Sequence, residues 1–137
     1  MANKSVEECL LNIFEDIELR NHVDFASKLS VKRYNAAGDR IRSNFQYIDQ
    51  NFPQHIDAII KLLDHPNPKV VAYCAVAMQD LLHCSIADKR KGIAKVKQFI
   101  ADDSINIPDK VWLSLIWINQ AERNLERIGL GDDSPIV

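Results

Sequence analysis

The chain lacks the short motifs by which most enzymes and metal proteins are recognised. Its four glycines stand singly, so they form no phosphate-binding loop. The three cysteines, Cys9, Cys74 and Cys84, form no CxxC pair, and the four histidines are scattered, so the spacing of a zinc site is missing. Neither a nucleophile elbow nor a metalloprotease motif occurs. We therefore expect a protein that is not an enzyme and that carries no metal or other cofactor.

Long apolar runs are also missing. No stretch approaches the ~18 apolar residues that a membrane span requires, and the first residues carry acids instead of an apolar signal core. The odd number of cysteines, with Cys74 inside an apolar helical pattern, favours reduced thiols. These features predict a cytoplasmic protein. Its 137 residues suit a single domain, which we expect to span 1–131, with 132–137 as a flexible tail after Gly129 and Gly131.

Apolar residues recur at helical spacing along most of the chain, and no alternating strand pattern accompanied by turn residues is found. Ser5 and Glu8 form a capping box before the first pattern, Gly38 interrupts the second, and Pro53 suits the first turn of the third. The sequence therefore predicts an all-α fold. The expected helices cover 5–20, 24–48 (bent or divided at Gly38), 53–64, 68–82, 87–101 and 110–128.

Residues 59–82 are the most informative segment, because they combine two apolar-faced helices with the very short turn His65-Pro66-Asn67-Pro68. A shift of 41 residues places Lys69-Val70 on Lys110-Val111 and Gln79 on Gln120. A period of about forty residues is typical of repeats built from two helices. Such a repeat buries its apolar face by stacking on neighbours and acts by presenting a surface.

Segment 56–82 resembles a HEAT or armadillo-type unit, whose second helix typically opens with proline, a spacer, valine and then alanines. The matching residues here are Pro68, Val70, Ala72, Ala75 and Ala77. Val71 departs from the pattern, since the family often has arginine there. As a whole, the chain is similar to small, mostly uncharacterised bacterial HEAT-like domains. The resemblance implies about six helices in antiparallel pairs, forming a fragment of a right-handed solenoid.

In proteins of this kind the second helices line the concave wall, which is the usual binding surface. The polar side of helix 68–82 presents Lys69, Tyr73, Val76, Asp80 and His83, and the same shift along the sequence adds Lys110 and Trp117. Tyr73, Val76 and Trp117 would then form an apolar and aromatic patch inside a polar rim, as protein interfaces do. The alternative is that Trp117 packs under the C-terminal tail or against helix 87–101.

Charges are unevenly distributed although the net charge is only −2. Residues 1–20 hold five acids and two basic groups, whereas 86–97 hold five basic groups and one acid. The simplest interpretation is two solvated helix faces. A functional interpretation is that a basic partner is contacted by Glu15, Asp16 and Glu18, or by Asp80 beside the aromatic patch. With the resemblance and the missing catalytic motifs, this suggests a bacterial immunity protein that neutralises a cognate protein toxin, for example a nuclease.

Two other functions remain open. One is a HEAT-like domain that binds nucleic acid, because basic residues on two predicted helices would follow phosphates. The other is an adaptor or scaffold subunit. The basic residues are Lys89, Arg90, Lys91, Lys95 and Lys97 on helix 87–101, and Lys28, Lys32, Arg33, Arg40 and Arg42 on the second pattern.

Overall fold

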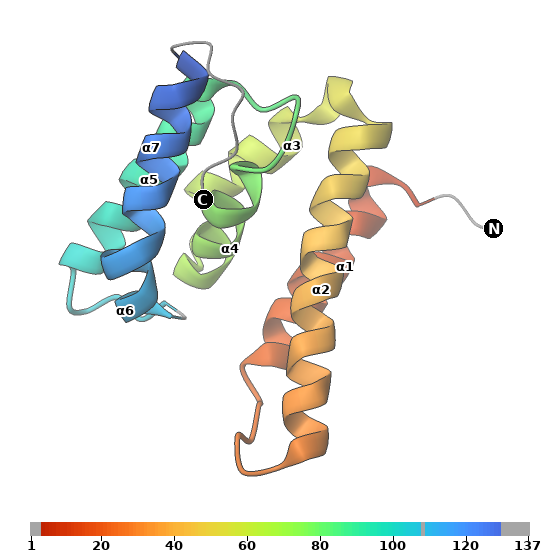
Figure 1. Cartoon of the computed structure of the whole chain (residues 1–137). Helices are drawn as coiled ribbons and strands as arrows, with labels where there is room; N and C mark the ends of the chain where they lie inside the picture. Colours follow the sequence, from red (N-terminus) through yellow and green to blue (C-terminus); the bar gives the residue numbers. More distant parts are fainter. Residues whose placement is uncertain (1–3, 108, 130–137) are drawn as a thin grey trace. The chain divides into compact units, whose positions relative to one another are not determined.

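The structure is a computed structural model that describes residues 4–107 and 109–129 (Figure 1). All regular elements within these residues are helices, which confirms the predicted all-α class. The chain forms two compact units, and unit 2 is interrupted by a short segment of unit 1. Unit 1 comprises Met1–Ile59 and Leu81–His83, and unit 2 comprises Ile60–Asp80 and Cys84–Val137. The single domain 1–131 stays a prediction, and the predicted tail 132–137 and Gly131 lie outside the described residues.

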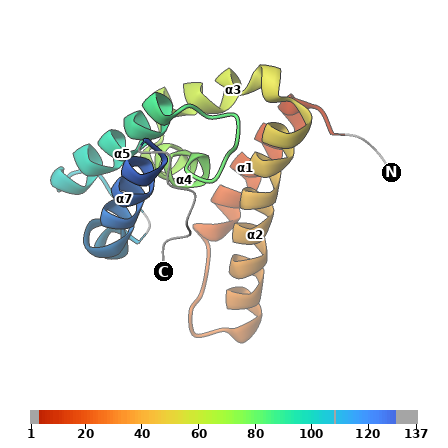
Figure 2. The same ribbon diagram turned by 45° about the horizontal axis from the view of Figure 1, so that its top comes forward.

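Unit 1 is built on two helices that lie side by side, α1 (Val6–Arg20) and α2 (Lys28–Asn51) (Figures 1 and 2). The Ser5 hydroxyl accepts a hydrogen bond from the backbone N–H of Glu8 at 3.1 Å and so starts α1 where the sequence predicts. Ser27 starts α2 in the same way. The core of the unit is aliphatic and aromatic, and its largest buried side chains are Ile13, Phe45 and Ile48.

Helix α2 continues through Gly38, so the expected division at this glycine is wrong. The glycine instead makes room for a cation from α1. A Cβ at position 38 would lie 3.2 Å from a guanidinium nitrogen of Arg20. The same guanidinium lies 3.8 Å from the centre of the Tyr34 ring, at the distance of a cation–π contact.

Two buried carboxylates join segments of unit 1 to one another. Asp16 on α1 accepts hydrogen bonds from Arg40 on α2, the shortest being 2.8 Å from Nη2. Asp49, which is 3% exposed, accepts hydrogen bonds from the backbone N–H groups of Leu82 and His83, both at 2.9 Å. Segment Leu81–His83 thereby belongs to unit 1, although the residues on both sides of it belong to unit 2.

The predicted helix 53–64 is broken into three short pieces, η1 (Pro53–His55), α3 (Asp57–Ile60) and η2 (Lys61–Asp64). Pro53 and the Pro66 turn leave only about a dozen residues between them, a length at which a helix is marginal without strong packing. The i→i+3 bond from the N–H of His65 to the carbonyl of Leu62, at 3.1 Å, tightens the last turn into a 3₁₀ form.

Unit 2 continues with α4 (Pro68–Met78) and α5 (Ile86–Ala101), which pack against each other. Asn67 caps α4 as predicted, since its side chain accepts from the N–H of Lys69 at 3.0 Å. The helices approach closely at Gly92, where a Cβ would lie 2.8 Å from Met78 Sδ. Helix α4 ends at Met78, before the predicted end at residue 82, and Leu82 is 83% exposed.

The predicted helix 110–128 contains a turn of π-helix. It consists of α6 (Lys110–Trp112), the π-helical turn η3 (Leu113–Trp117) and α7 (Ile118–Gly129). Asp109 precedes it with a left-handed backbone (φ 54°), a conformation that aspartate tolerates better than most residues. Helix α5 packs against α7 as well as against α4.

Candidate protein-binding surfaces

The outer side of α1 is acidic and carries two exposed leucines. Leu11 is 56% exposed and Leu19 is 40% exposed, two helical turns apart. We call the exposed residues on this side of the helix the α1 outer face. Arg20 is the only basic residue of α1, and it stacks on Tyr34. The face therefore joins negative charge to apolar contact area. Its exposed residues are Glu7, Glu8, Leu11, Glu15, Glu18 and Leu19.

Three acids of this helix were predicted to contact a basic partner. Two of them, Glu15 and Glu18, are exposed. Glu18 also contacts His22 at 3.0 Å and Asn21 at 3.3 Å. Asp16 is buried and faces α2, where Arg40 holds it with both Nε and Nη2. Its charge is used inside the unit, so the expectation that Asp16 contacts a partner is corrected. The hydrogen bond to Asp16 also raises the pKa of the Arg40 guanidinium.

The stripe expected along helix 68–82 is only partly present. Lys69, Tyr73 and Val76 are half-buried on α4, and Asp80 is exposed in the turn that follows. His83 is exposed, and its Nδ1 lies 3.2 Å from Oδ1 of Asp49. Because α4 ends at Met78, Asp80 and His83 do not continue its helical face.

Trp117 lies in the core at 7% exposure, so its expected place in a surface patch is wrong. The π-helical turn gives the reason. Buried side chains follow steps of four residues, at Leu113, Trp117, Ala121 and Leu125. A π-turn holds more residues than an α-turn, so residues four apart at the π-turn stay on the inner side. The shift of 41 residues, which matches Trp117 to Val76 of helix 68–82, placed Trp117 on the outside.

Lys110 is occupied within its own unit. Its ammonium donates hydrogen bonds to the carbonyls of Asp102, at 3.0 Å, and Ile105, at 2.8 Å. It therefore ties the chain after α5 to the start of α6 and is not the free rim cation that the sequence suggested. The carboxylate of Asp102 accepts hydrogen bonds from Ser104, which lower its pKa.

The sequence analysis did not predict a second surface, which lies on the outer side of segment 110–117. Trp112 is 44% exposed there. The strict four-residue spacing of Leu113, Trp117, Ala121 and Leu125 is the signal that could have identified it, because it fixes which side faces inward. We call the exposed apolar residues on the outer side the α6–η3 face. They are Val111, Trp112, Leu115 and Ile116, all exposed.

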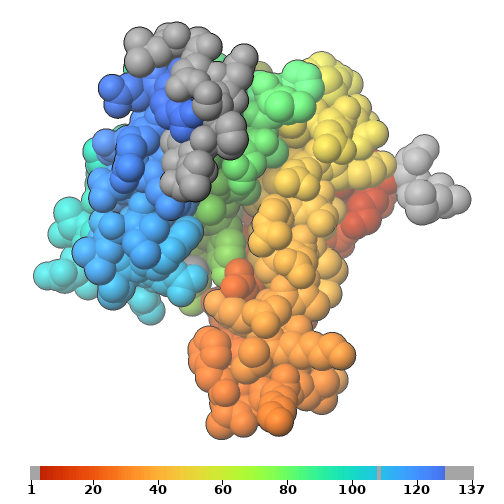
Figure 3. Space-filling view, viewed as in Figure 1, coloured from red at the N-terminus to blue at the C-terminus, as the bar shows by residue number. Residues whose placement is uncertain are grey.

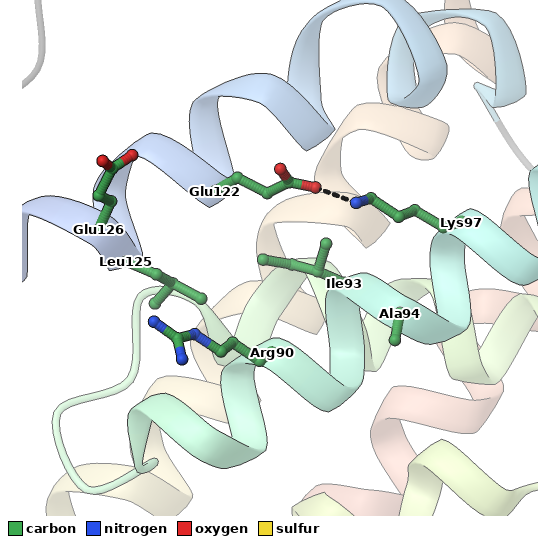
Figure 4. Close-up of a pocket in the computed structure, with 7 residues that line it drawn as sticks. All are labelled: Arg90, Ile93, Ala94, Lys97, Glu122, Leu125 and Glu126. Atoms are coloured by element: carbon green, nitrogen blue, oxygen red, sulfur yellow. Dashed lines mark ion pairs between the residues drawn. The ribbon is translucent and has the colours of Figure 1, made fainter. Parts of the chain in front are cut away.

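The basic residues of α5 are largely compensated. Lys89 is buried at 8% exposure, so it cannot follow a phosphate chain, and that expectation is corrected. Lys91 lies 3.4 Å from Asp88, and Lys95 lies 3.8 Å from Asp64. Lys97 pairs with Glu122 across a groove of about 450 Å³ between α5 and α7, which Arg90 also lines (Figure 4). Neighbouring acids reduce the positive potential that phosphate binding needs.

Within residues 4–107 and 109–129, no three His, Cys, Asp or Glu side chains gather as a metal site would need. The three cysteines are buried, and none of them is in a disulfide. Burial, with a smaller effect of Cys84, raises the pKa of the Cys74 thiol to about 12, and burial also raises that of Cys9. Such thiols are poor nucleophiles at neutral pH. In the same residues, no helix combines the length and the hydropathy that crossing a membrane demands.

Comparison of the chain with protein-family profiles, with curated proteins and with solved structures gives no significant match. The HEAT-like resemblance therefore stays a prediction. Among the described residues, the α1 outer face and the α6–η3 face each expose more than one large apolar side chain.

Proposed function

We propose that this chain is a non-catalytic binding protein whose partner is a basic protein, and specifically that it is a bacterial immunity protein that neutralises a cognate toxin. The α1 outer face carries the proposal. It exposes four glutamates, and its one basic residue stacks on Tyr34. Charge of one sign on a helix face steers an oppositely charged partner and speeds association.

The two exposed leucines, Leu11 and Leu19, add affinity that the glutamates alone do not provide. Exposed acids are well solvated and add little affinity individually. Leu11 and Leu19 bring apolar area that binding removes from water, which favours the bound state. The glutamates around them would form the polar rim of an interface whose centre is apolar.

Helix α1 is also held rigidly, which lowers the entropic cost of binding. Its inner side buries Ile13 and Ile17 in the core of unit 1. The Asp16–Arg40 ion pair fixes it to α2. A basic toxin would meet a preformed surface and would be blocked by occlusion of its own active site.

We further infer that the helices pair antiparallel, as in a right-handed HEAT-like solenoid fragment. The connections 21–27 and 79–85 are short, as is usual for neighbouring antiparallel helices. Close packing of α1 on α2 and of α4 on α5 supports the same inference.

The test uses the full chain, immobilised, as bait in an extract treated with nuclease and washed at about 0.15 M salt, where charges are screened beyond ~8 Å. We expect a basic protein in stoichiometric amount, and we expect co-expression of the chain to relieve the toxicity of that protein. Replacing Glu7, Glu15 and Glu18 together by glutamine should reduce both capture and protection.

The matched control replaces Asp57, Asp103 and Glu126, which are exposed and lie outside α1, by their amides. It changes the net charge by the same amount and should leave capture intact. Equal capture by both triple variants, or a captured protein that is lost when the extract is treated with nuclease, would rule out the α1 outer face as the binding site.

A further inference from the structure

The α6–η3 face holds most of the large apolar side chains that are exposed in the described part of unit 2. Val111 and Leu115 are 72% and 68% exposed, and Ile116 is 46% exposed beside Trp112. In Figure 3 the light-blue residues of this segment lie at the surface of the unit. Helical spacing places all four side chains on one side, opposite the buried Leu113 and Trp117.

The helix segment that carries this face has no charged side chain, and the nearest acid before it is the exposed Asp109. Residues 111–121 contain no acidic, basic or histidine side chain. Lys110, the nearest basic residue in sequence, directs its ammonium to the carbonyls of Asp102 and Ile105. The four apolar side chains offer a charged partner no ion pair, whereas an identical face would oppose them with apolar side chains only.

We propose that the α6–η3 face binds the α6–η3 face of a second copy of this chain. A two-fold contact places the same patch on both sides, so the patch has to be complementary to itself. An uncharged apolar strip on a helix meets this condition, and the acidic α1 outer face does not. The inference is independent of the proposed function, because it concerns other residues in the other unit.

The size of the face sets the strength of the contact. Four apolar side chains at these exposures offer on the order of 300 Å² per copy. A stable interface buries about 800 Å² per partner. The face is thus the apolar centre of a small interface, and the dimer is weak and depends on protein concentration.

Sedimentation equilibrium of the full chain over a wide concentration range tests the proposal, together with tryptophan fluorescence. The chain has two tryptophans, and Trp117 is already buried. The mass should rise from monomer to dimer, and the emission should shift to shorter wavelength as Trp112 loses water. In Trp112→Phe, the emission of Trp117 should not change with concentration.

Leu115→Glu should raise the dissociation constant about tenfold or more, because two carboxylates would then face each other in an apolar contact. Leu29→Glu is the matched control, since Leu29 is 57% exposed on α2 of unit 1. It should leave the dimer unchanged. A monomer at every concentration would overturn the proposal, and so would a dimer that tolerates both Leu115→Glu and Val111→Glu.

Discussion

Replacing Asp49 by asparagine should destabilise the protein far more than an exposed acid on the same helix would. The Asp49 carboxylate is buried and accepts from two backbone N–H groups at 2.9 Å, those of Leu82 and His83, and lies 3.2 Å from Nδ1 of His83. In the asparagine variant one of its oxygens becomes an NH₂ group, which faces a donor instead of accepting from it.

The magnitude follows from these contacts. A hydrogen bond to a charged group contributes about 1.5–3 kcal/mol, and a donor left unsatisfied costs a similar amount. One backbone bond is lost in Asp49→Asn and the other becomes neutral, so we expect a loss of about 2–4 kcal/mol. That is a large part of the ~5–15 kcal/mol by which domains are stable.

Urea unfolding followed by helical circular dichroism measures this loss as a lower midpoint. Asp39→Asn is the matched control, because Asp39 lies on α2, has a 74% exposed side chain and pairs with Arg42 at 3.4 Å. It should change the free energy of unfolding by less than about 0.5 kcal/mol. If the two variants unfold at the same urea concentration, the inference that Asp49 holds Leu81–His83 in unit 1 is wrong.

Two further predictions concern unit 2. Trp117→Ala should cost about 3–5 kcal/mol in thermal or urea unfolding because it empties a core position, whereas Trp112→Ala should cost less than about 1 kcal/mol; comparable losses would contradict the assigned orientation of the helix. The pKa of Cys74 is raised from 9.0 to about 12 in the folded protein. Between these pH values the folded protein keeps the thiol proton and the unfolded chain loses it. The free energy of unfolding should therefore fall as the pH rises from 9 towards 12. The free energy of unfolding should fall by at most about 1.4 kcal/mol per pH unit. Cys74→Ala should reduce this pH dependence, and parallel curves for the variant and the wild type would contradict the prediction.

Features that depend on neighbouring residues were predictable from the sequence. Ser5 and Asn67 cap their helices because a cap bonds to an N–H only two or three residues away. The all-α class follows from apolar spacing, which is also local. Gly38 was expected to bend or divide its helix, but it lies inside an undivided α2 and leaves space that Arg20 from α1 occupies.

Features that depend on distant partners were not predictable. Asp16 looked like one more surface acid, and only the position of Arg40, twenty-four residues later, shows that it is buried and paired. Asp49 similarly acts on a segment more than thirty residues away. The π-helical turn changes which residues face inward, so Trp117 is buried although the shift of 41 residues placed it at the surface.

The most direct test of the proposed function is the association rate of the captured protein with the wild-type chain at low salt and at about 0.15 M salt. If the α1 outer face steers a basic partner, the rate falls as salt rises. At low salt the Glu7, Glu15 and Glu18 triple variant then associates as slowly as the wild type does at high salt, and the Asp57, Asp103 and Glu126 control does not. Equal low-salt rates for the wild type and the α1 variant would contradict the proposal.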